Sequence, residues 1–277
     1  MKADLHCHSH YSDGFHAPDF LLKHAAENGV THLAITDHDC TTALEKPLDD
    51  CYDTQLIPGI EISCQWETQE IHLIGLGIDR NNTELRNLLS RQQASRRSRC
   101  EAINTLLEAN GIEGLLDYLE ALPATTLTRS HVADFLVLSG HTKNKQKAFK
   151  QYLGKKSKAY VPFSWISLAE AISTVHGAGG LSVLAHPGRY ALNKRKLATL
   201  VSYFAENEGI GMEVSYGGID PIMQKHLEQL AESSSLYVSA GSDFHNAEAH
   251  WTDIGKFPTP SSAAIKNAIW NHPRWHL

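Results

Sequence analysis

The chain has 277 residues, of which 42% are hydrophobic and 20% are charged, with a formal net charge of −6, values that are typical of globular proteins. No apolar run reaches the roughly 20 residues that a membrane span requires, and the N-terminus MKADLHCHSHYSDG has histidines and acids where a secretory signal has an apolar stretch. We therefore expect a cytoplasmic protein without membrane association, whose five cysteines, lacking CxxC spacing, are reduced thiols (Cys7, Cys40, Cys51, Cys64 and Cys100).

The N-terminal part of the chain alternates short apolar strands with a helical pattern. The predicted elements are strands at 3–7, 32–36, 55–62 and 70–76, and a helix at 18–28 that ends before Gly29. Alternation of this kind is typical of α/β proteins with a mostly parallel sheet, either a barrel or a doubly wound sheet. The length of the chain allows one barrel with an insertion as well as two domains.

The alternation is interrupted by a helical and basic segment. Helical spacing predicts helices at 85–110, 114–121, 129–138 and 144–152. From Arg86 to Lys158 there are 13 Lys and Arg against 6 Asp and Glu, a charge of +7, whereas the remainder has 12 against 25, a charge of −13. A solvated helical face is the simple interpretation of such a charge run. The alternative hypothesis is a surface that attracts a polyanionic substrate.

After this segment the strand and helix alternation resumes. The predicted elements are helices at 167–176, 194–207 and 221–233 and strands at 181–185, 211–215 and 236–241. Ser164 or Ser167 is expected to cap the first of these helices. From Pro258 onward the sequence predicts a loop and a short helix with tryptophan that closes the barrel.

Ionisable residues recur at the ends of the predicted strands. They are His6, His8 and Asp13 at the first strand, Asp37 and His38 at the second, Glu61 at the third, His72 within the fourth, His186 after 181–185, and Asp243 and His245 after the last strand. In barrels the loops at the carboxyl ends of strands build the active site, so we expect these side chains to converge. Residues two apart in a strand share a face, so His6 and His8 can bind one cation together. Imidazole is the commonest metal ligand, and the pattern predicts a metal site, with Asp37 orienting a ligand imidazole.

The motifs LHCHSHYSDG, ITDHD, GIEIS, EIHLIG, AHPGRY and GSDFH resemble, in this order, those of the PHP (polymerase and histidinol phosphatase) family. The resemblance spans nearly the whole chain. TRSHVADFLV and the stretch from Trp251 to Gly255 place it with the branch of 3′,5′-nucleoside bisphosphate phosphatases and ribonuclease AM, a 5′-to-3′ exoribonuclease. It implies a distorted (β/α)7 barrel formed by residues 1–84 and 159–277, with a basic helical insertion at 85–158 that contributes to substrate binding.

The resemblance also implies nine metal ligands. One metal would be held by His6, His8, Glu61 and Asp243, a second by Glu61 as a bridge with His72 and His186, and a third by Asp13, His38 and His245. Ser130 departs from the family pattern, which has proline there, but the flanking Arg129 and His131 are in place. We expect two to three divalent metal ions, manganese before iron or zinc because carboxylates bridge the ions.

Three further residues are candidates for substrate contact and catalysis. The guanidinium groups of Arg129 and Arg189 match phosphate oxygens bidentately, and His131 is a third contact or a proton donor to the leaving oxygen. The alternative for each arginine is a solvated surface position. The metals would activate a water and neutralise charge on a phosphoryl group.

The function that these features predict is metal-dependent hydrolysis of phosphate esters of nucleotides. We expect the substrate to be the 3′-phosphate of nucleoside 3′,5′-bisphosphates, the 5′ end of short RNA, or both, without an obligate protein partner. The alternative is a phosphatase for a small non-nucleotide ester such as histidinol phosphate. A regulatory or proofreading module within a larger assembly is less consistent with the complete ligand set.

Overall fold

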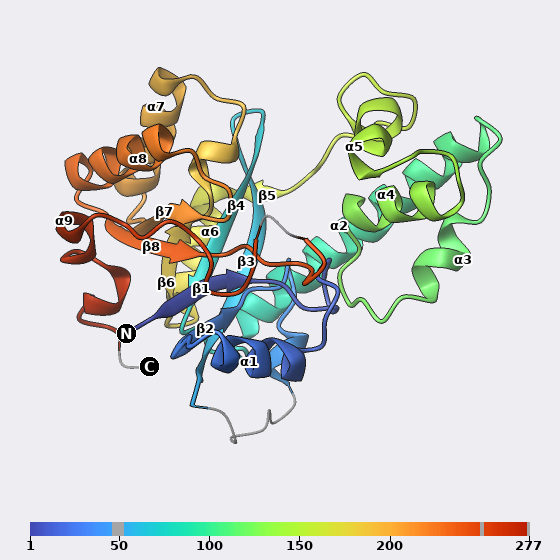
Figure 1. Cartoon of the computed structure of the whole chain (residues 1–277). Coiled ribbons are helices and arrows are strands. Elements are labelled where there is room, and N and C mark those ends of the chain that lie inside the picture. The colour runs from blue at the N-terminus through green and yellow to red at the C-terminus, as the bar shows by residue number, and fades with distance from the viewer. Residues whose placement is uncertain (46–52, 250–251, 276–277) are drawn as a thin grey trace.

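The computed structural model describes residues 1–45, 53–249 and 252–275, so Cys51 and Trp251 lie outside the described residues. Eight strands form one sheet that curves into a nearly closed barrel (Figure 1). They are β1 (Ala3–Cys7), β2 (His32–Ile35), β3 (Gln55–Trp66), β4 (Gln69–Leu76), β5 (Ile166–Ser167), β6 (Leu181–Leu184), β7 (Gly211–Tyr216) and β8 (Tyr237–Gly241).

The sheet has the strand order β1-β2-β3-β4-β6-β7-β8, and the short β5 pairs with β3 outside this path. The two ends of the path meet where β8 leads into the segment beside β1. The backbone N–H of Asp243 donates to the carbonyl of His6 at 2.8 Å, and that of His8 donates to the carbonyl of Phe244 at 2.9 Å. The seven strands of the path therefore form the distorted barrel that the family resemblance implies, and the doubly wound alternative is excluded.

The direction of one strand differs from the mostly parallel sheet that the sequence predicts. β4 runs antiparallel to both of its neighbours, β3 and β6. The reason is a hairpin, because β3 continues past Ile62 to Trp66 and turns through Glu67, which has a φ of 51°, into β4. So short a connection leaves no room for the helical crossover that parallel strands require. Glu61 consequently lies within a strand, and not at the end of one as predicted.

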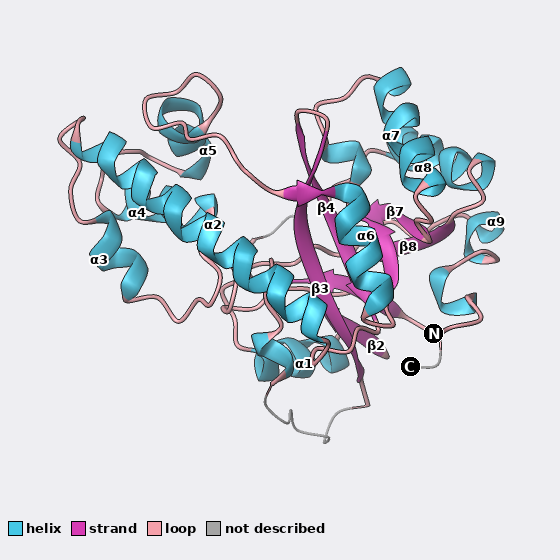
Figure 2. Ribbon diagram, turned by 180° about the vertical axis from the view of Figure 1, so that it is seen from behind, coloured by secondary structure: helices cyan, strands magenta, loops and turns pink. Residues whose placement is uncertain are grey.

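Helices cover the outside of the barrel and supply most of its core together with the strands (Figures 1 and 2). The helices around the barrel are α1 (Pro18–Glu27), η1 (Thr42–Leu44), α6 (Leu168–Gly177), η3 (Pro187–Arg189), α7 (Lys194–Glu206), α8 (Pro221–Ser233), α9 (Ser262–Ile265) and η4 (Ile269–Asn271). Of the two predicted caps of α6, Ser167 is the one used: its hydroxyl accepts a hydrogen bond from the Glu170 backbone at 3.1 Å. None of the helices in the described ranges is long and apolar enough to span a membrane.

The predicted insertion contains the long helix α2 (Thr83–Glu108), α3 (Leu115–Glu120), α4 (Arg129–Leu138) and α5 (Lys145–Ala148), which runs into a π-helical turn (Phe149–Leu153). α2 starts against the barrel and extends away from it to the other three helices (Figure 2). These helices form a hydrophobic cluster of their own, which includes Leu107, Leu115, Val132 and Leu153. Leu85, Leu88 and Leu89 at the start of α2 belong instead to the core of the barrel, so α2 spans both hydrophobic clusters. The boundaries of the insertion at 85–158 remain a prediction.

Candidate metal centre

The nine predicted metal ligands lie together, although they are distributed along most of the sequence. Their coordinating atoms form four overlapping groups, within each of which all atoms lie within 4.8 Å of one another. The groups are His8, Asp13, His38 and His245; His6, Glu61 and His186; His6, His8 and Asp243; and His38, Glu61 and His72. Four residues belong to two groups each, so the nine side chains form one continuous cluster. Their assignment to individual metals remains a prediction.

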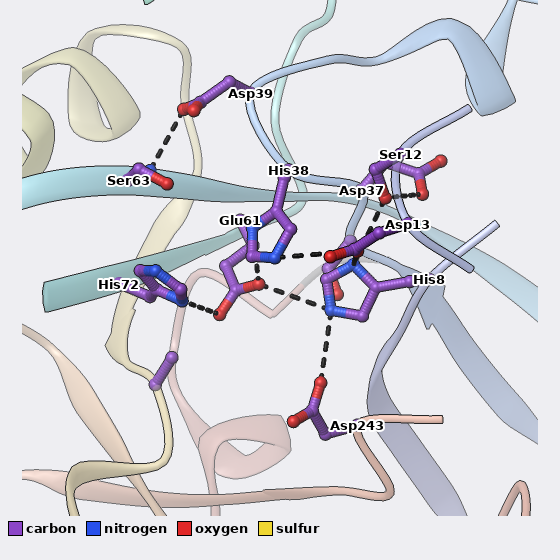
Figure 3. A network of polar contacts seen from close by, with 12 residues as sticks. His8, Ser12, Asp13, Asp37, His38, Asp39, Glu61, Ser63, His72 and Asp243 are labelled. Carbon is purple, nitrogen blue, oxygen red and sulfur yellow. Dashed lines mark hydrogen bonds and ion pairs between the residues drawn. The ribbon is translucent and has the colours of Figure 1, made fainter. Parts of the chain in front are cut away.

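Glu61 lies in the middle of this cluster (Figure 3). In the β3–β4 pair Ser63 is opposite His72, so Glu61, two residues before Ser63, shares a face with His72. One ring nitrogen of each of His38, His72 and His186 lies 3.0 Å from a carboxylate oxygen of Glu61. A buried carboxylate with imidazoles on both oxygens has the arrangement needed to bridge two cations.

Two further carboxylates extend the cluster on the side of β1 and β8. Asp243 Oδ1 lies 3.3 Å from Nε2 of His6 and 3.2 Å from Nε2 of His8. Asp13 Oδ1 lies 3.4 Å from Nε2 of His245. Figure 3 shows His8 between Asp243 and Asp13, pointing into the space that these carboxylates share with Glu61. His6 and His8, which the two-residue spacing places on one face, therefore contribute to one group with Asp243.

Buried polar atoms without a well-aligned hydrogen bond indicate that the cluster fits metal ions. Among the described residues seven buried side-chain atoms have no hydrogen bond, and four of them belong to the cluster: Asp13 Oδ1, His38 Nδ1, Glu61 Oε2 and His186 Nδ1. The first three face other groups of the cluster without the alignment of a hydrogen bond, such as His38 Nδ1 at 3.0 Å from Glu61 Oε2. Such atoms are rare in protein interiors because each carries a desolvation cost. Imidazole nitrogens and carboxylate oxygens without thiolate are the ligands of divalent manganese, iron and zinc. The residues present therefore fit the metals that the resemblance implies.

Burial and neighbouring charges shift the pKa values of the side chains in the cluster. Burial opposes ionisation of Glu61 and Asp243, but the imidazoles around them hold the pKa of both carboxyls well below the usual range. Burial, and then the charge of His245, lowers the pKa of His8 to about 3. Burial also acts on His38, but Glu61 and the other carboxylate beside it raise its pKa to about 9. The carboxylates are thus ionised, and cation binding would displace a proton from His38.

Two of the candidate ligands have a left-handed backbone. His186 has a φ of 28° and Asp243 a φ of 52°. Non-glycine residues in this region cost about 1–3 kcal/mol and cluster at functional sites. Hydrogen bonds hold both in place: the N–H of His186 donates to Glu213 Oε2 at 2.6 Å, and the N–H of Asp243 donates to the carbonyl of His6. The strain places both side chains in the cluster.

Glu213 is a residue of the site that the sequence analysis missed. It is fully buried, and its Oε1 lies 3.1 Å from Nδ1 of His6, the ring nitrogen opposite the one that faces the cluster. A carboxylate in this position fixes the orientation and tautomer of a metal-binding imidazole. The available signal was a single acid within the strand GMEVSY, all of which is buried, because a charged residue is almost never fully buried without a partner.

Asp37 makes its hydrogen bonds to the loop after β1, and not directly to a ligand imidazole. Its Oδ1 accepts hydrogen bonds from the backbone N–H of Ser9 at 2.7 Å and from the hydroxyl of Ser12 at 2.6 Å. The Ser12 hydroxyl in turn lies 3.4 Å from Nδ1 of His8. The predicted effect on a ligand imidazole is therefore indirect, and the direct effect is to hold the loop that carries Asp13.

Arg189 reaches the cluster directly. Its Nη1 forms an ion pair with Asp243 Oδ2, and its Nη2 donates to the carbonyl of Gly217 at 3.0 Å. The guanidinium also lies 5.0 Å from the ring centroid of Tyr216. The side chain is 36% exposed, so one side of the guanidinium is open to solvent beside the candidate metal ligands.

Arg129 is held by an acidic residue next to the cluster and is not a free surface arginine. Its Nη2 lies 2.7 Å from Oε2 of Glu70, which precedes His72 by two residues on β4. Glu70 also accepts a hydrogen bond from Trp165 Nε1 at 2.7 Å and has Nη1 of Arg99 at 3.7 Å. Two guanidinium groups therefore share one carboxylate, which leaves an excess positive charge beside His72.

His131 lies at the start of α4, where its Nδ1 accepts a hydrogen bond from the backbone N–H of Thr128 at 3.1 Å. Its role as a substrate contact or proton donor stays a prediction. The backbone N–H groups of Thr125 and Thr126 donate to the carbonyl of Tyr11 at 2.9 and 3.0 Å. These two hydrogen bonds hold the insertion against the loop that carries Asp13.

Comparisons with known proteins agree with this geometry. Residues 4–217 match the model of the PHP domain. The chain is 38% identical to the 5′-3′ exoribonuclease Rnm of Escherichia coli (strain K12), over 98% of its own length and 94% of the relative's. It is 34% identical to a 3′,5′-nucleoside bisphosphate phosphatase of Chromobacterium violaceum, over 96% and 94% of the two chains.

A solved structure shares the fold. That of an amidohydrolase from Chromobacterium violaceum, with bound sulfate and no metal, has a TM-score of 0.88 and 32% identity, covering 98% of this chain and 95% of the other. The relatives confirm the predicted class of enzyme, a phosphoric ester hydrolase. With the family match over most of its length and two relatives above 30% identity, the chain belongs to the PHP domain family.

Proposed function

We propose that this chain hydrolyses the phosphate ester on the 3′ side of a nucleotide whose 5′-phosphate it also binds. That chemistry covers nucleoside 3′,5′-bisphosphates and the 5′ end of short RNA, the substrate classes named for the two relatives. The observation that carries the proposal is the position of the cluster between two arginines: Arg189 contacts Asp243, and Arg129 pairs with Glu70 two residues from His72. Such a site can engage two phosphates at once.

The residues of the cluster would hold two to three divalent ions, with Glu61 as a bridge and Glu213 orienting His6. Manganese is our first expectation, and iron and zinc are the alternatives, because mixed imidazole and carboxylate ligation suits all three. Divalent cations in such a site lower the pKa of a water toward neutrality and neutralise charge on a phosphoryl group. The barrel contributes the fixed positions of the ligands.

The arginines would bind the phosphate that is not hydrolysed. A guanidinium presents a planar fork that matches two phosphate oxygens, and Arg129 needs only to exchange or share its carboxylate partner Glu70 to do so. Arg99 beside it keeps Glu70 compensated when Arg129 turns to a substrate. Arg189 is the second candidate, since its guanidinium is partly open to solvent.

A substrate panel tests the proposal. With metal-replete enzyme, kcat/KM for adenosine 3′,5′-bisphosphate is expected to exceed that for adenosine 3′-monophosphate at least about tenfold, equivalent to about 1.4 kcal/mol of transition-state binding. Short 5′-phosphorylated RNA should likewise exceed the same RNA with a 5′-hydroxyl. A ratio near one in both pairs would contradict the proposal. Faster hydrolysis of histidinol phosphate than of either nucleotide substrate would support the small-ester alternative.

A further inference from the structure

The insertion carries an exposed run of lysines that the candidate metal centre does not use. Between residues 143 and 158 there are seven lysines and no acidic residue, and all seven side chains are exposed (Lys143, Lys145, Lys147, Lys150, Lys155, Lys156 and Lys158). We refer to residues 143–158 as the lysine segment. Within the described ranges only Lys145 of these seven forms an ion pair, with Asp134 at 2.9 Å. The other six charges face solvent.

The lysine segment is a folded element and not a loose charged loop. Ala148 and Leu153 are buried in the hydrophobic cluster of the insertion. The chain then folds back on the π-helical turn, where the N–H of Gly154 donates to the carbonyl of Phe149 at 2.7 Å and that of Ala159 to the carbonyl of Tyr152 at 2.8 Å. These contacts fix the backbone, so the lysines project from a stable surface. A fixed array of cations loses little conformational entropy in the backbone when an anion binds.

Phe149 in the middle of the lysine segment, and Val161 three residues after its end, contact the arginines beside the candidate metal centre. The Phe149 ring lies 5.7 Å from Cζ of Arg129, and the carbonyl of Val161, just after the segment, accepts hydrogen bonds from Arg99 Nε and Nη2 at 3.1 and 3.0 Å. Both arginines contact Glu70. In Figure 1 the segment, from α5 onward, lies between the insertion helices and the strand β5, to which it leads. The folded lysine segment is therefore joined, through Phe149 and Val161, to the two arginines that contact Glu70 beside His72.

We infer that the lysine segment binds the phosphates of single-stranded RNA downstream of the bond that is hydrolysed. The inference rests on the proposed function. A nucleoside bisphosphate has only two phosphates, which the metal centre and one arginine would occupy, so the unpaired lysines have no partner in that substrate. A longer chain would extend past Arg129 onto the segment, and each phosphate that it neutralises would release counterions. Tyr152 lies 5.7 Å from the Lys158 ammonium and adds an aromatic surface of the kind that stacks on bases.

The test compares two triple variants that remove the same charge. The first is Lys150→Gln, Lys155→Gln, Lys156→Gln in the lysine segment, where none of the three side chains makes an ion pair or hydrogen bond with the residues that the structure describes. The matched control is Lys23→Gln, Lys225→Gln, Lys266→Gln, exposed positions on barrel helices and at the end of α9. Substrates are 5′-phosphorylated single-stranded RNA of about 20 nucleotides, longer than common single-strand binding sites, and adenosine 3′,5′-bisphosphate.

We expect the lysine-segment variant to raise KM for the RNA about tenfold with kcat within twofold, and to leave kcat/KM for the bisphosphate within twofold. The slope of log kcat/KM against log salt for the RNA should become shallower by about 2, from three lost phosphate contacts. The control variant should change none of these. Equal losses on both substrates, an unchanged salt slope, or the same loss in the control would overturn the inference.

Direct binding separates this inference from the proposed function. Fluorescence anisotropy with a labelled, hydrolysis-resistant phosphorothioate RNA of the same length needs no turnover, so it reports on the lysine segment even if the enzyme prefers another ester. We expect the dissociation constant to rise about tenfold in the lysine-segment variant and not in the control. Equal dissociation constants for the wild type and the lysine-segment variant would overturn the inference. So would a protein that does not bind RNA but binds phosphatidylserine vesicles through these lysines.

Discussion

At the scale of single residues, the site depends on carboxylates that each contact several groups. Glu61 contacts imidazoles from three different elements, and Glu213 joins the ring of His6 to the backbone of His186. Glu70 likewise contacts two groups, the guanidinium groups of Arg129 and Arg99. A substitution at one such carboxylate therefore changes the position of several side chains, and matched variants are needed to separate their roles.

Arg129 is expected to contribute to transition-state binding. Arg129→Ala should lower kcat/KM for the bisphosphate by about 30-fold to 1000-fold, or roughly 2 to 4 kcal/mol, while the metal content stays unchanged. Arg129→Lys should recover only part of the loss, because a point charge cannot reproduce the planar fork. Steady-state kinetics and metal analysis of both variants measure this.

Glu70→Gln is the control for the Arg129 prediction. If Arg129 serves only as the ion-pair partner of Glu70, removing either charge should give the same kinetic loss. Phosphate recognition predicts instead that Glu70→Gln retains most of the activity, since the arginine remains. A near-wild-type Arg129→Ala would transfer the phosphate contact to Arg189.

Glu213→Gln should weaken metal binding without unfolding the chain. The amide keeps the size of the side chain but removes the charge beside His6 Nδ1, so the imidazole becomes a weaker and less fixed ligand. Loss of such a supporting group costs about 10-fold to 100-fold in metal affinity. Competition with a chromophoric chelator measures the affinity, and Glu232→Gln, exposed on α8, is the control. Equal affinities in the two variants would refute a role for Glu213.

At the scale of elements, the insertion and the barrel are joined through groups next to the metal centre. Arg96 of α2 places Nη2 2.7 Å from Asp39 Oδ2 and donates to the Ser63 hydroxyl at 2.7 Å, and all three side chains are buried. Asp39 directly follows His38, and Ser63 is paired with His72. α2 thus stabilises two of the segments that carry candidate ligands.

Arg96→Met is expected to destabilise the protein strongly, because it leaves the buried carboxylate of Asp39 without its cation. Removing one partner of a buried ion pair costs about 3–5 kcal/mol. Arg97→Met, one residue along the same helix and exposed, should cost less than about 0.5 kcal/mol. Urea denaturation of the two variants compares them. A similar free energy of unfolding for both would show that the Arg96 pair does not hold the insertion to the barrel.

At the scale of the whole molecule, the cluster joins strands from the beginning to the end of the chain. Nε2 of His6, on β1, lies 3.3 Å from Oδ1 of Asp243, which follows β8 at the point where the barrel closes. Glu61 on β3 and His186 after β6 connect the opposite part of the sheet. Ions bound here would link all of these strands, so metal binding and barrel stability should be coupled.

Removal of metal should therefore lower the melting temperature. A metal present at about 100 times its dissociation constant stabilises the folded state by about 2.7 kcal/mol, which corresponds to a shift of roughly 5–11 °C for a chain of this size. Calorimetry with and without a chelator, followed by addition of manganese, iron or zinc, measures the shift and ranks the metals. Asp243→Ala should stay folded and lose most of this response. An identical melting temperature after metal removal would contradict the coupling.

The sequence alone was sufficient to predict the elements of the barrel and the nine residues of the cluster. Apolar periodicity identifies most of the strands and helices, although not the two-residue β5, and the two-residue spacing of His6 and His8 predicts that their side chains share a face. The resemblance of the motifs then implied one family, which the comparisons confirmed. Periodicity and spacing involve residues that are close in sequence, so secondary structure and the direction of a side chain can be predicted from them.

Only the tertiary structure decided which groups meet across elements. The antiparallel β4 follows from a tight hairpin that the strand pattern did not reveal. Glu213 joins the site because β7 pairs with β8, which lies beside β1 where the sheet closes. The pairing of Arg129 with Glu70 and the hydrogen bonds of the Thr125 and Thr126 backbone to Tyr11 depend on how the insertion packs on the barrel. Periodicity reports whether a side chain is buried, but its partner depends on the packing of segments that are distant in sequence.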